Sequence, residues 1–305
     1  MEIVLLLLRQ NLVMLLYLMI GYLVYRGKLV TSAGSAEIGK MLLYLVMPMA
    51  IVKSYIRDFS KQALLGLTVS FLAAALALAL AVCISALLLR KAGAVRQFGA
   101  AFSNAGFIGI PLVQMTLGEE AVFYVASFVA ILNILQWTYG VWLITGDKSC
   151  VSMTKLRTNP ILISFAAGLV LLFAPISLPS PLMGMVSTIA SMNGPLAMIV
   201  LGCYLAQVPL KTIFLDIRSY QCAAVRLVVI PLFSILLLCL VPGQYADIRM
   251  AVLLAASAPV GSNVAIFAQI YHADYGAAVK DVCLSTICSI VTMPLMMAAA
   301  GLVWR

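Results

Sequence analysis

The chain has 305 residues, of which 64% are hydrophobic and only 10% are charged. A soluble protein of this length needs more charge to cover its surface, so the composition excludes a soluble globular protein. The net charge is +9, but the basic residues fall in short loops and at the ends of apolar runs. No arginine-rich or aromatic-interleaved face is present in the sequence, so the charge indicates membrane topology and not nucleic-acid binding.

Apolar runs long enough to cross about 30 Å of hydrocarbon recur along the chain. We count ten, at 4–25, 38–56, 63–89, 97–117, 121–145, 160–174, 181–206, 219–241, 248–271 and 276–303. The sequence therefore predicts an all-α polytopic membrane protein with ten transmembrane helices. The first run contains Arg9 and is followed by no small-residue cleavage site, so we expect a retained span and not a removed signal.

The distribution of lysine and arginine predicts the orientation. Thirteen basic residues fall on one side: Arg26, Lys28, Lys40, Arg90, Lys91, Arg96, Lys148, Lys155, Arg157, Lys211, Arg218, Arg226 and Lys280. Six fall on the other side: Arg9, Lys53, Arg57, Lys61, Arg249 and Arg305. By the positive-inside rule the richer side faces the cytoplasm, which places both termini outside the cytoplasm.

The two halves of the chain share landmarks at a nearly constant offset. Asn11, Gly21, Pro48 and Pro111 recur as Asn159, Gly168, Pro195 and Pro259, 147 or 148 residues later. This pattern predicts a first five-helix repeat over 1–146, a short cytoplasmic linker over 147–159, and a second repeat over 160–305. Because five spans per repeat is an odd number, the second repeat must be inverted relative to the first.

Two apolar runs are interrupted by glycine, proline and asparagine at matching places in the two repeats. The interruptions lie at 103–111 in the fourth span and 257–263 in the ninth. Unpaired backbone groups at bilayer depth are tolerated only where the backbone is buried in protein or lines a polar cavity. We therefore expect the fourth and ninth helices to be broken, to cross near the midplane and to form a transporter's substrate site.

Four ordered motifs carry a resemblance to a known family. They are the run 104–112 (NAGFIGIPL), Asn159-Pro160, the stretch 194–202, and the stretch 284–295 (LSTICSIVTMPL). In these residues the chain resembles the auxin efflux carrier family, which includes the plant PIN carriers and bacterial permeases assigned to malate, malonate and related organic anions. The resemblance implies a fold similar to that of bile-acid transporters and the antiporter NhaA, located in the bacterial inner membrane.

The same resemblance implies a division of the helices. Helices 1, 2, 6 and 7 would form a scaffold, and helices 3–5 with 8–10 a mobile transport domain. Members of the family are homodimers through the scaffold, which implies a homodimer here. The long cytoplasmic loop of the plant carriers is absent, since only about a dozen residues separate the fifth and sixth spans.

Eight residues are predicted to bind substrate: Asn104, Gly106, Gly109, Pro111, Gln136, Pro259, Gly261 and Asn263. Broken helices present free N–H groups and the positive end of the helix dipole, which together suit a carboxylate. For Asn104 two roles remain open, because its amide can donate to an anion or can pair with a carbonyl freed by the kink. The same two roles remain open for Asn263.

Other polar residues within the spans have more than one reading. Asn133 and Gln136 share a helix face, where they either bond a neighbouring helix or line a cavity. The hydroxyl stripe Ser285, Thr286, Ser289 and Thr292 either packs against small residues or lines the crossing.

Lys280 and Asp281 are expected to form an interfacial pair, and no acidic residue is predicted at a span centre. Coupling is then absent or uses neutral ligands, with sodium or proton coupling left open.

The sequence predicts a secondary transporter of small organic anions that works by alternating access. One alternative is a sodium- or proton-coupled symporter of bile-acid-like or other amphipathic anions, and another is an anion-selective channel. Enzyme chemistry is not expected, since no nucleophile is paired with a base within the spans. The sequence also contains no phosphate-binding loop for ATP-driven transport. His272 is the lone histidine and the seven cysteines form no ligand spacing, so we expect no metal and no cofactor.

Overall fold

The structure is a computed structural model that describes residues 2–56, 60–174, 178–207, 209 and 213–304. Arg57, Lys211 and Arg305, which entered the sequence-based topology, lie outside the described residues. Helices make up almost all of the described chain. They are α1 (Glu2–Arg26), α2 (Ser32–Met41), η1 (Leu42–Val46), α3 (Met47–Tyr55), α4 (Lys61–Leu88), η2 (Arg90–Ala92), α5 (Ala94–Ala101), η3 (Ala105–Gly109), α6 (Ile110–Leu117), α7 (Glu119–Leu135), η4 (Gln136–Gly140), α8 (Val141–Thr145), η5 (Lys148–Cys150), α9 (Met153–Arg157), α10 (Pro160–Phe173), α11 (Ser180–Ser191), α12 (Asn193–Ala206), α14 (Ile217–Ala224), η6 (Val225–Val229), α15 (Ile230–Leu238), η7 (Gly243–Tyr245), α16 (Ala246–Ser257), α17 (Asn263–Ile270) and α18 (Tyr275–Val303).

Within the described residues, six continuous helical stretches are long and apolar enough to cross a membrane. They are Ser32–Tyr55, Lys61–Leu88, Glu119–Thr145, Ser180–Ala206, Ile217–Leu238 and Tyr275–Val303. A seventh candidate is the pair of Lys148–Arg157, which comprises η5 and α9, and Pro160–Phe173, which is α10; the two are bent by 46°. The prediction of an all-helical, multi-span membrane protein is therefore confirmed. Two further predicted spans, 97–117 and 248–271, correspond to interrupted helices, and the ten-span inverted repeat stays a prediction.

Local sequence explains where several helices begin. The Ser60 hydroxyl accepts from the amide of Ala63 at 3.0 Å and caps α4. Asn159 Oδ1 accepts from the amide of Ile161 at 2.9 Å, so it caps α10, and Pro160 occupies the first turn. Side-chain caps satisfy amides that have no partner within the helix, and proline has no amide to leave unpaired there. The Asn159-Pro160 motif is thus a helix start.

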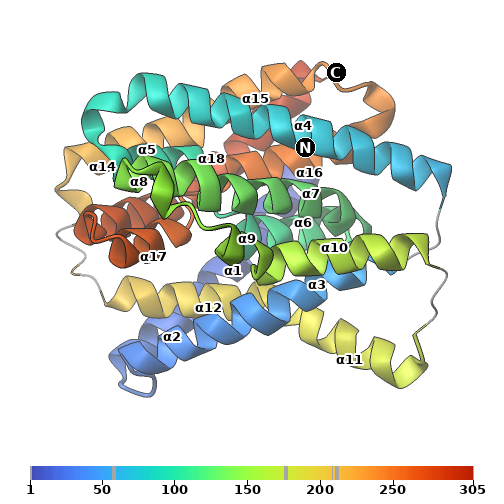
Figure 1. Ribbon diagram of the computed structural model, residues 1–305, viewed down its shortest axis with the longest axis horizontal. Coiled ribbons are helices and arrows are strands. Elements are labelled where there is room, and N and C mark those ends of the chain that lie inside the picture. Colours follow the sequence, from blue (N-terminus) through green and yellow to red (C-terminus); the bar gives the residue numbers. More distant parts are fainter. Residues whose placement is uncertain (1, 57–59, 175–177, 208, 210–212, 305) are drawn as a thin grey trace.

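Glycines bring two pairs of helices into close contact. A Cβ on Gly21 of α1 would lie 2.0 Å from the carbonyl oxygen of Ile199 of α12, and one on Gly202 would lie 2.0 Å from that of Leu18. The backbones of α1 and α12 therefore touch, as small residues allow in membranes. Similarly, the Tyr55 ring of α3 packs on Gly168 of α10. Figure 1 shows α2, α3, α11 and α12 at one edge of the molecule and α4, α14 and α15 at the opposite edge.

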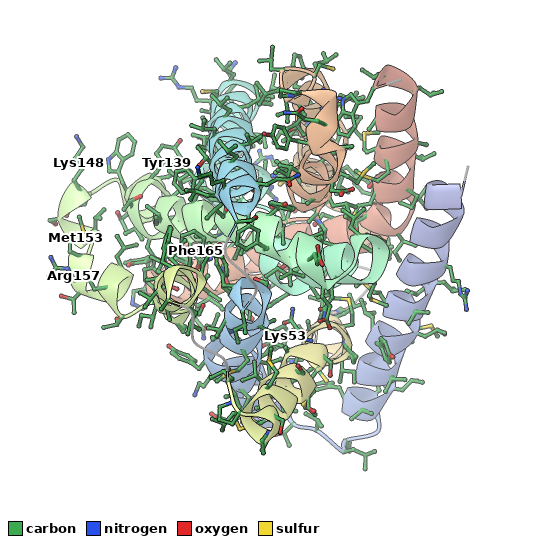
Figure 2. The ribbon with its side chains drawn as sticks, turned by 90° about the vertical axis from the view of Figure 1, so that its right-hand side faces the viewer. Lys53, Tyr139, Lys148, Met153, Arg157 and Phe165 are labelled. Carbon is green, nitrogen blue, oxygen red and sulfur yellow. The ribbon has the colours of Figure 1, made fainter. Side chains whose placement is uncertain are left out.

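The connection 147–159 projects from the helical body. In Figure 2, Lys148, Met153 and Arg157 lie at its outer edge, away from the packed helices. Asp147 accepts from the Ser149 hydroxyl at 2.6 Å and from its amide at 2.8 Å, and these bonds lower the pKa of Asp147 below its ordinary value. The connection therefore has local order of its own while remaining exposed.

Candidate functional site

The two interrupted segments meet in the middle of the molecule. Helix α5 ends at Ala101 and α16 ends at Ser257, and the extended residues that follow form an antiparallel bridge between Ser103 and Val260. The amide of Asn104 donates to the carbonyl of Pro259 at 2.7 Å, and the amide of Gly261 donates to the carbonyl of Phe102 at 3.0 Å. Each interruption thus satisfies backbone groups of the other. We call residues 102–104 and 259–261 the crossing.

Two features allow the crossing to form: a glycine within it, Gly261, and a hydroxyl from a neighbouring helix, Ser285. A Cβ on Gly261 would lie 3.1 Å from the carbonyl oxygens of both Phe102 and Ser103, tighter than ordinary contact. The amide of Val260 donates to Ser285 Oγ of α18 at 3.1 Å. Ser285 therefore pairs a backbone amide that the break leaves free, which agrees for this residue with the reading that the hydroxyl stripe lines the crossing.

Arg226 pairs the carbonyl groups at the ends of both interrupted helices. Its side chain, from η6, is only 1% exposed. Nη1 donates to the carbonyls of Ala100 at 2.9 Å and Ala101 at 3.2 Å, and Nη2 donates to the carbonyl of Ala256. These carbonyls lie at the negative ends of α5 and α16, so the guanidinium compensates both helix dipoles. The expectation that Arg226 belongs to a loop is wrong, because the residue lies buried within a helical segment.

The opposite helix ends at the crossing are positive. The helical stretch η3–α6 starts at Ala105 and α17 starts at Asn263, so both present their N-terminal amides here. Helix N-termini attract anions. Because Arg226 already compensates the negative ends, the positive ends dominate the local field.

A small cavity lies against the crossing. Its volume is about 20 Å³, room for about one water molecule. The lining residues are Leu43, Met47, Ser103, Asn104, Gly106, Phe107, Val129, Leu132, Asn133, Ile161, Gly261 and Asn263. None of these described lining residues is acidic.

Several polar atoms here are buried without a hydrogen-bond partner among the described residues. They are Nδ2 of Asn104, Nε2 of Gln136 and Oγ of Ser103. Asn104 is 5% exposed and Gln136 is fully buried, so neither donor reaches bulk solvent. A buried donor without an acceptor costs about 1–3 kcal/mol. Asn104 Nδ2 therefore does not repair a carbonyl freed by the kink.

The structure brings most of the predicted site residues together. Asn104, Gly106, Gly261 and Asn263 line the cavity. Gln136 lies next to it, since Asn263 Nδ2 donates to Gln136 Oε1 at 2.9 Å.

The other three predicted residues have different surroundings. The Pro259 carbonyl is occupied by the amide of Asn104. Gly109 faces Ala255 of α16, and Pro111 faces Gly194 of α12, so neither lines the cavity.

Asn133 combines its two predicted roles. Its Nδ2 donates to the carbonyl of Val129 at 2.8 Å, and its Oδ1 accepts from Asn159 Nδ2 of α10 at 3.3 Å. It also lines the cavity. The residue therefore bonds a neighbouring helix and contributes to the wall, although it was not among the predicted binding residues.

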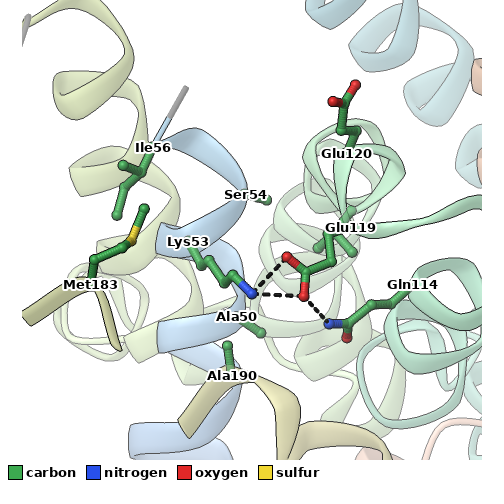
Figure 3. Close-up of a pocket in the computed structure, with 10 residues that line it drawn as sticks. Ala50, Lys53, Ser54, Ile56, Gln114, Glu119, Glu120, Met183 and Ala190 are labelled. Atoms are coloured by element: carbon green, nitrogen blue, oxygen red, sulfur yellow. Dashed lines mark hydrogen bonds and ion pairs between the residues drawn. The ribbon is translucent and has the colours of Figure 1, made fainter. Parts of the chain in front are cut away.

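A second, larger cavity lies along the same helices. Its volume is about 490 Å³, and Figure 3 shows Lys53 of α3 and Glu119 of α7 pointing toward each other within it. Lys53 Nζ lies 2.6 Å from Glu119 Oε2, and Gln114 Nε2 donates to Glu119 Oε1 at 3.5 Å. The walls come from α3, α6, α7 and α11, and α3 and α7 also contribute to the small cavity about two helical turns farther along. One cation and several amide or carboxylate groups thus line an open vestibule.

The expected interfacial pair of Lys280 and Asp281 is also wrong. Asp281 is only 1% exposed, and its charged neighbour is Arg96, whose Nε lies 3.8 Å from Asp281 Oδ1. Lys280 instead faces Asp216, with Nζ 3.9 Å from Oδ2. No local signal in the sequence indicates this burial, because Asp281 lies only about two turns from the start of α18, where an interfacial position is ordinarily expected.

Long apolar helices, interruptions that pair with each other and buried polar groups at the resulting crossing define a multi-span membrane protein built around a polar centre. The family of membrane transport proteins, the auxin efflux carrier family, matches residues 8–297, and the chain belongs to this family. It is a transporter and not an enzyme.

A curated relative gives more detail. A protein of Rhizobium meliloti (strain 1021) named "Putative malonate transporter" is 29% identical over 210 residues. The aligned region covers 65% of this chain and 64% of that relative, so the two proteins are similar over somewhat less than two thirds of their lengths.

Proposed function

We propose that the protein is a secondary transporter of small organic anions that binds a substrate carboxylate at the crossing. The observation that carries this proposal is the set of buried donors without partners, Asn104 Nδ2 and Gln136 Nε2, beside two positive helix ends. A carboxylate would accept from these donors and from free amides, and Arg226 removes the competing negative field. The residues we assign to substrate binding are Asn104, Gln136, Gly261 and Asn263.

Malonate and similar short dicarboxylates are the substrates we favour. The named relative supports this class. The vestibule adds a physical reason, because Lys53 is held by Glu119 and a carboxylate of an entering substrate could replace that partner before the substrate moves on to the crossing. The Glu119 side chain is 57% exposed, and ion pairs that solvent reaches contribute only about 0–1 kcal/mol, so such an exchange is energetically accessible.

The fold we propose has ten spans in two inverted repeats. Helix α1 packs on α12 through Gly21 and Gly202, and α3 packs on α10 through Gly168. If α1 and α10 are the first helices of the two repeats, the α1–α12 and α3–α10 contacts are equivalent. In each contact the first helix of one repeat packs against the second helix of the other. These four helices would form the scaffold of a homodimer, with both termini outside the cytoplasm.

Transport would follow alternating access. The cavity at the crossing holds about one water, whereas the vestibule of about 490 Å³ shares the helices α3 and α7 with it. Substrate binding at the crossing therefore requires the helices around the small cavity to separate. An anion channel, the rival mechanism, would need a continuous open path.

Proteoliposomes loaded with unlabelled malonate test the proposal. We expect labelled malonate outside to enter by counterflow, to saturate, and to be inhibited by other short dicarboxylates. Protein-free liposomes and liposomes with the Asn104→Asp variant serve as controls. Single-channel currents carried by the same anions, or uptake that does not saturate, would contradict a carrier.

A further inference from the structure

A buried charged cluster lies at one end of three packed helices, away from the crossing. Its members come from the N-terminal parts of α5, α14 and α18, which contact one another. Arg96 of α5 is 7% exposed and Asp281 of α18 is 1% exposed. The proposed function assigns no role to either residue.

The geometry leaves the Asp281 carboxylate poorly satisfied. Arg96 Nη2 donates to Asp216 Oδ2 at 2.8 Å, whereas Arg96 Nε lies 3.8 Å from Asp281 Oδ1, beyond hydrogen-bond distance. Neither carboxylate oxygen of Asp281 has a hydrogen bond of ordinary geometry among the described residues, and Ser219 and Cys222 of α14 are the potential donors beside it. A charged carboxylate without hydrogen bonds in a dry interior costs several kcal/mol.

The charges around Asp281 favour a proton over a metal ion as the group that completes the site. The charged and titratable groups that face this cluster are Arg96 from α5, Asp216 and Cys222 from α14, and Lys280 from α18, with Arg226 behind Cys222. Two cations already flank the two carboxylates, so a sodium ion would meet like charge. A proton on Asp281 removes the buried charge and leaves Arg96 fully paired with Asp216.

The same helices lead directly to the crossing. Arg96 lies in the first turn of α5, five residues before this helix ends at Ala101. Cys222 Sγ donates to the carbonyl of Arg96 at 3.6 Å, and α14 continues into η6, where Arg226 holds the carbonyls of Ala100 and Ala101. A change in the partner of Arg96 therefore acts on a helix whose other end forms the substrate site.

We propose that Asp281 is a proton-binding residue that couples anion transport to a proton gradient, with Arg96 positioned to respond to its charge. The coupling part of this proposal rests on the proposed function. Protonated Asp281 leaves the Arg96–Asp216 pair in place, and ionised Asp281 competes with Asp216 for Arg96. Proton release on one side of the membrane thereby changes the packing of α5.

Protonation can be measured without any substrate. Infrared difference spectra of the purified protein in lipid, taken on acidification, show the C=O stretch of each carboxylic acid that forms. We expect one such band in the parent that is absent from Asp281→Asn, shifted in position in Asp281→Glu, and retained in Asp247→Asn. Asp247 is an exposed carboxylate at the start of α16 and provides the matched control. Identical spectra for the parent and correctly folded Asp281→Asn would overturn the proposal.

Transport measurements test the coupling. We expect a tenfold proton gradient to drive up to about tenfold accumulation of labelled malonate if one proton moves with each substrate. Asp281→Asn should lose this accumulation but keep malonate exchange, with malonate on both sides, within about twofold of the parent. Accumulation that follows a sodium gradient, or that persists in Asp281→Asn, would overturn the coupling role. If the parent exchanges no malonate, the proposed substrate is wrong, whereas the infrared result still decides whether Asp281 binds a proton.

Discussion

At the scale of single residues, Arg226 shows how a positive charge is kept in the interior of a membrane protein. Its described hydrogen-bond partners are backbone carbonyls at two helix ends, and no described ion pair joins it to a carboxylate. Charged side chains in membrane helices are expensive and usually functional. Here the charge replaces the capping groups that two buried helix ends would otherwise lack.

Replacing Arg226 by Met should therefore prevent correct folding. At least three carbonyls would lose their donor, and each buried unsatisfied group costs about 1–3 kcal/mol. We expect Arg226→Met to give little monodisperse protein in size-exclusion chromatography. Arg226→Lys keeps the charge with fewer donors, so it should fold with a lower thermal midpoint. A stable Arg226→Met protein with normal transport would show that the carbonyls do not need this side chain.

Asn104 carries the prediction about substrate. Because its Nδ2 is buried and lacks a partner, Asn104→Ala should fold normally and weaken substrate binding by about 1.5–3 kcal/mol, the range for a hydrogen bond to a charged group. Binding can be measured by isothermal calorimetry with malonate. Asn104→Asp keeps the shape and adds negative charge, so it should abolish uptake at a pH where the residue is ionised. Unchanged uptake by folded Asn104→Asp would place the site elsewhere.

At the scale of elements, the two interrupted helices depend on each other. Neither break can satisfy its own backbone, and each supplies one donor and one acceptor to the other. In hydrocarbon such groups must be paired within the protein. Short π-helical segments, η3, η4 and η6, surround this region, as is frequent near functional sites.

Gly261→Ala tests how closely the two segments must approach. The added Cβ would lie 3.1 Å from two backbone oxygens, which cannot move without opening the crossing. We expect a lower thermal midpoint and loss of most counterflow. Gly184→Ala in α11 is the matched control, since its Cβ would meet no atom within 4 Å, and it should behave like the parent. Equal stability of the two variants would mean that the crossing can accommodate a Cβ at position 261 without a change in the backbone.

At the scale of the whole molecule, the connection 147–159 bears on how the protein is oriented in the membrane. The exposed connection 147–159 carries Lys148, Lys155 and Arg157, and three basic residues in a short loop are typical of the cytoplasmic side. Cys150 lies within it and is partly exposed. The connection therefore provides a chemical marker for one face.

A variant that keeps Cys150 and replaces the other six cysteines tests the orientation. We expect an impermeant thiol reagent to leave Cys150 unlabelled in intact cells and to label it after the membrane is opened. Mass spectrometry of the purified protein provides the measurement. Labelling in intact cells would reverse the proposed orientation and place both termini in the cytoplasm.

The helices and the two interruptions could be predicted from the sequence, because apolar runs and Gly/Pro/Asn breaks are local signals. The partners of the buried charged residues Arg226 and Asp281 could not be predicted. Arg226 lies in the first third of the run 219–241, where a basic residue is ordinarily counted with the adjoining loop, and its carbonyl partners are 30, 125 and 126 residues away along the chain. The burial of Asp281 likewise depends on α5 and α14. Tertiary packing, which one sequence does not reveal, decides both.

The bridge at the crossing has a consequence for the exchange of backbone hydrogens with solvent. The amides of Asn104 and Gly261 lie outside regular helices, where loop amides ordinarily exchange within moments of transfer to heavy water. Here each is hydrogen-bonded across the crossing, and Asn104 is almost fully buried. Their deuterium uptake, followed by mass spectrometry, should therefore be as slow as that of core helices. Faster uptake in the presence of malonate would then report opening of the crossing itself.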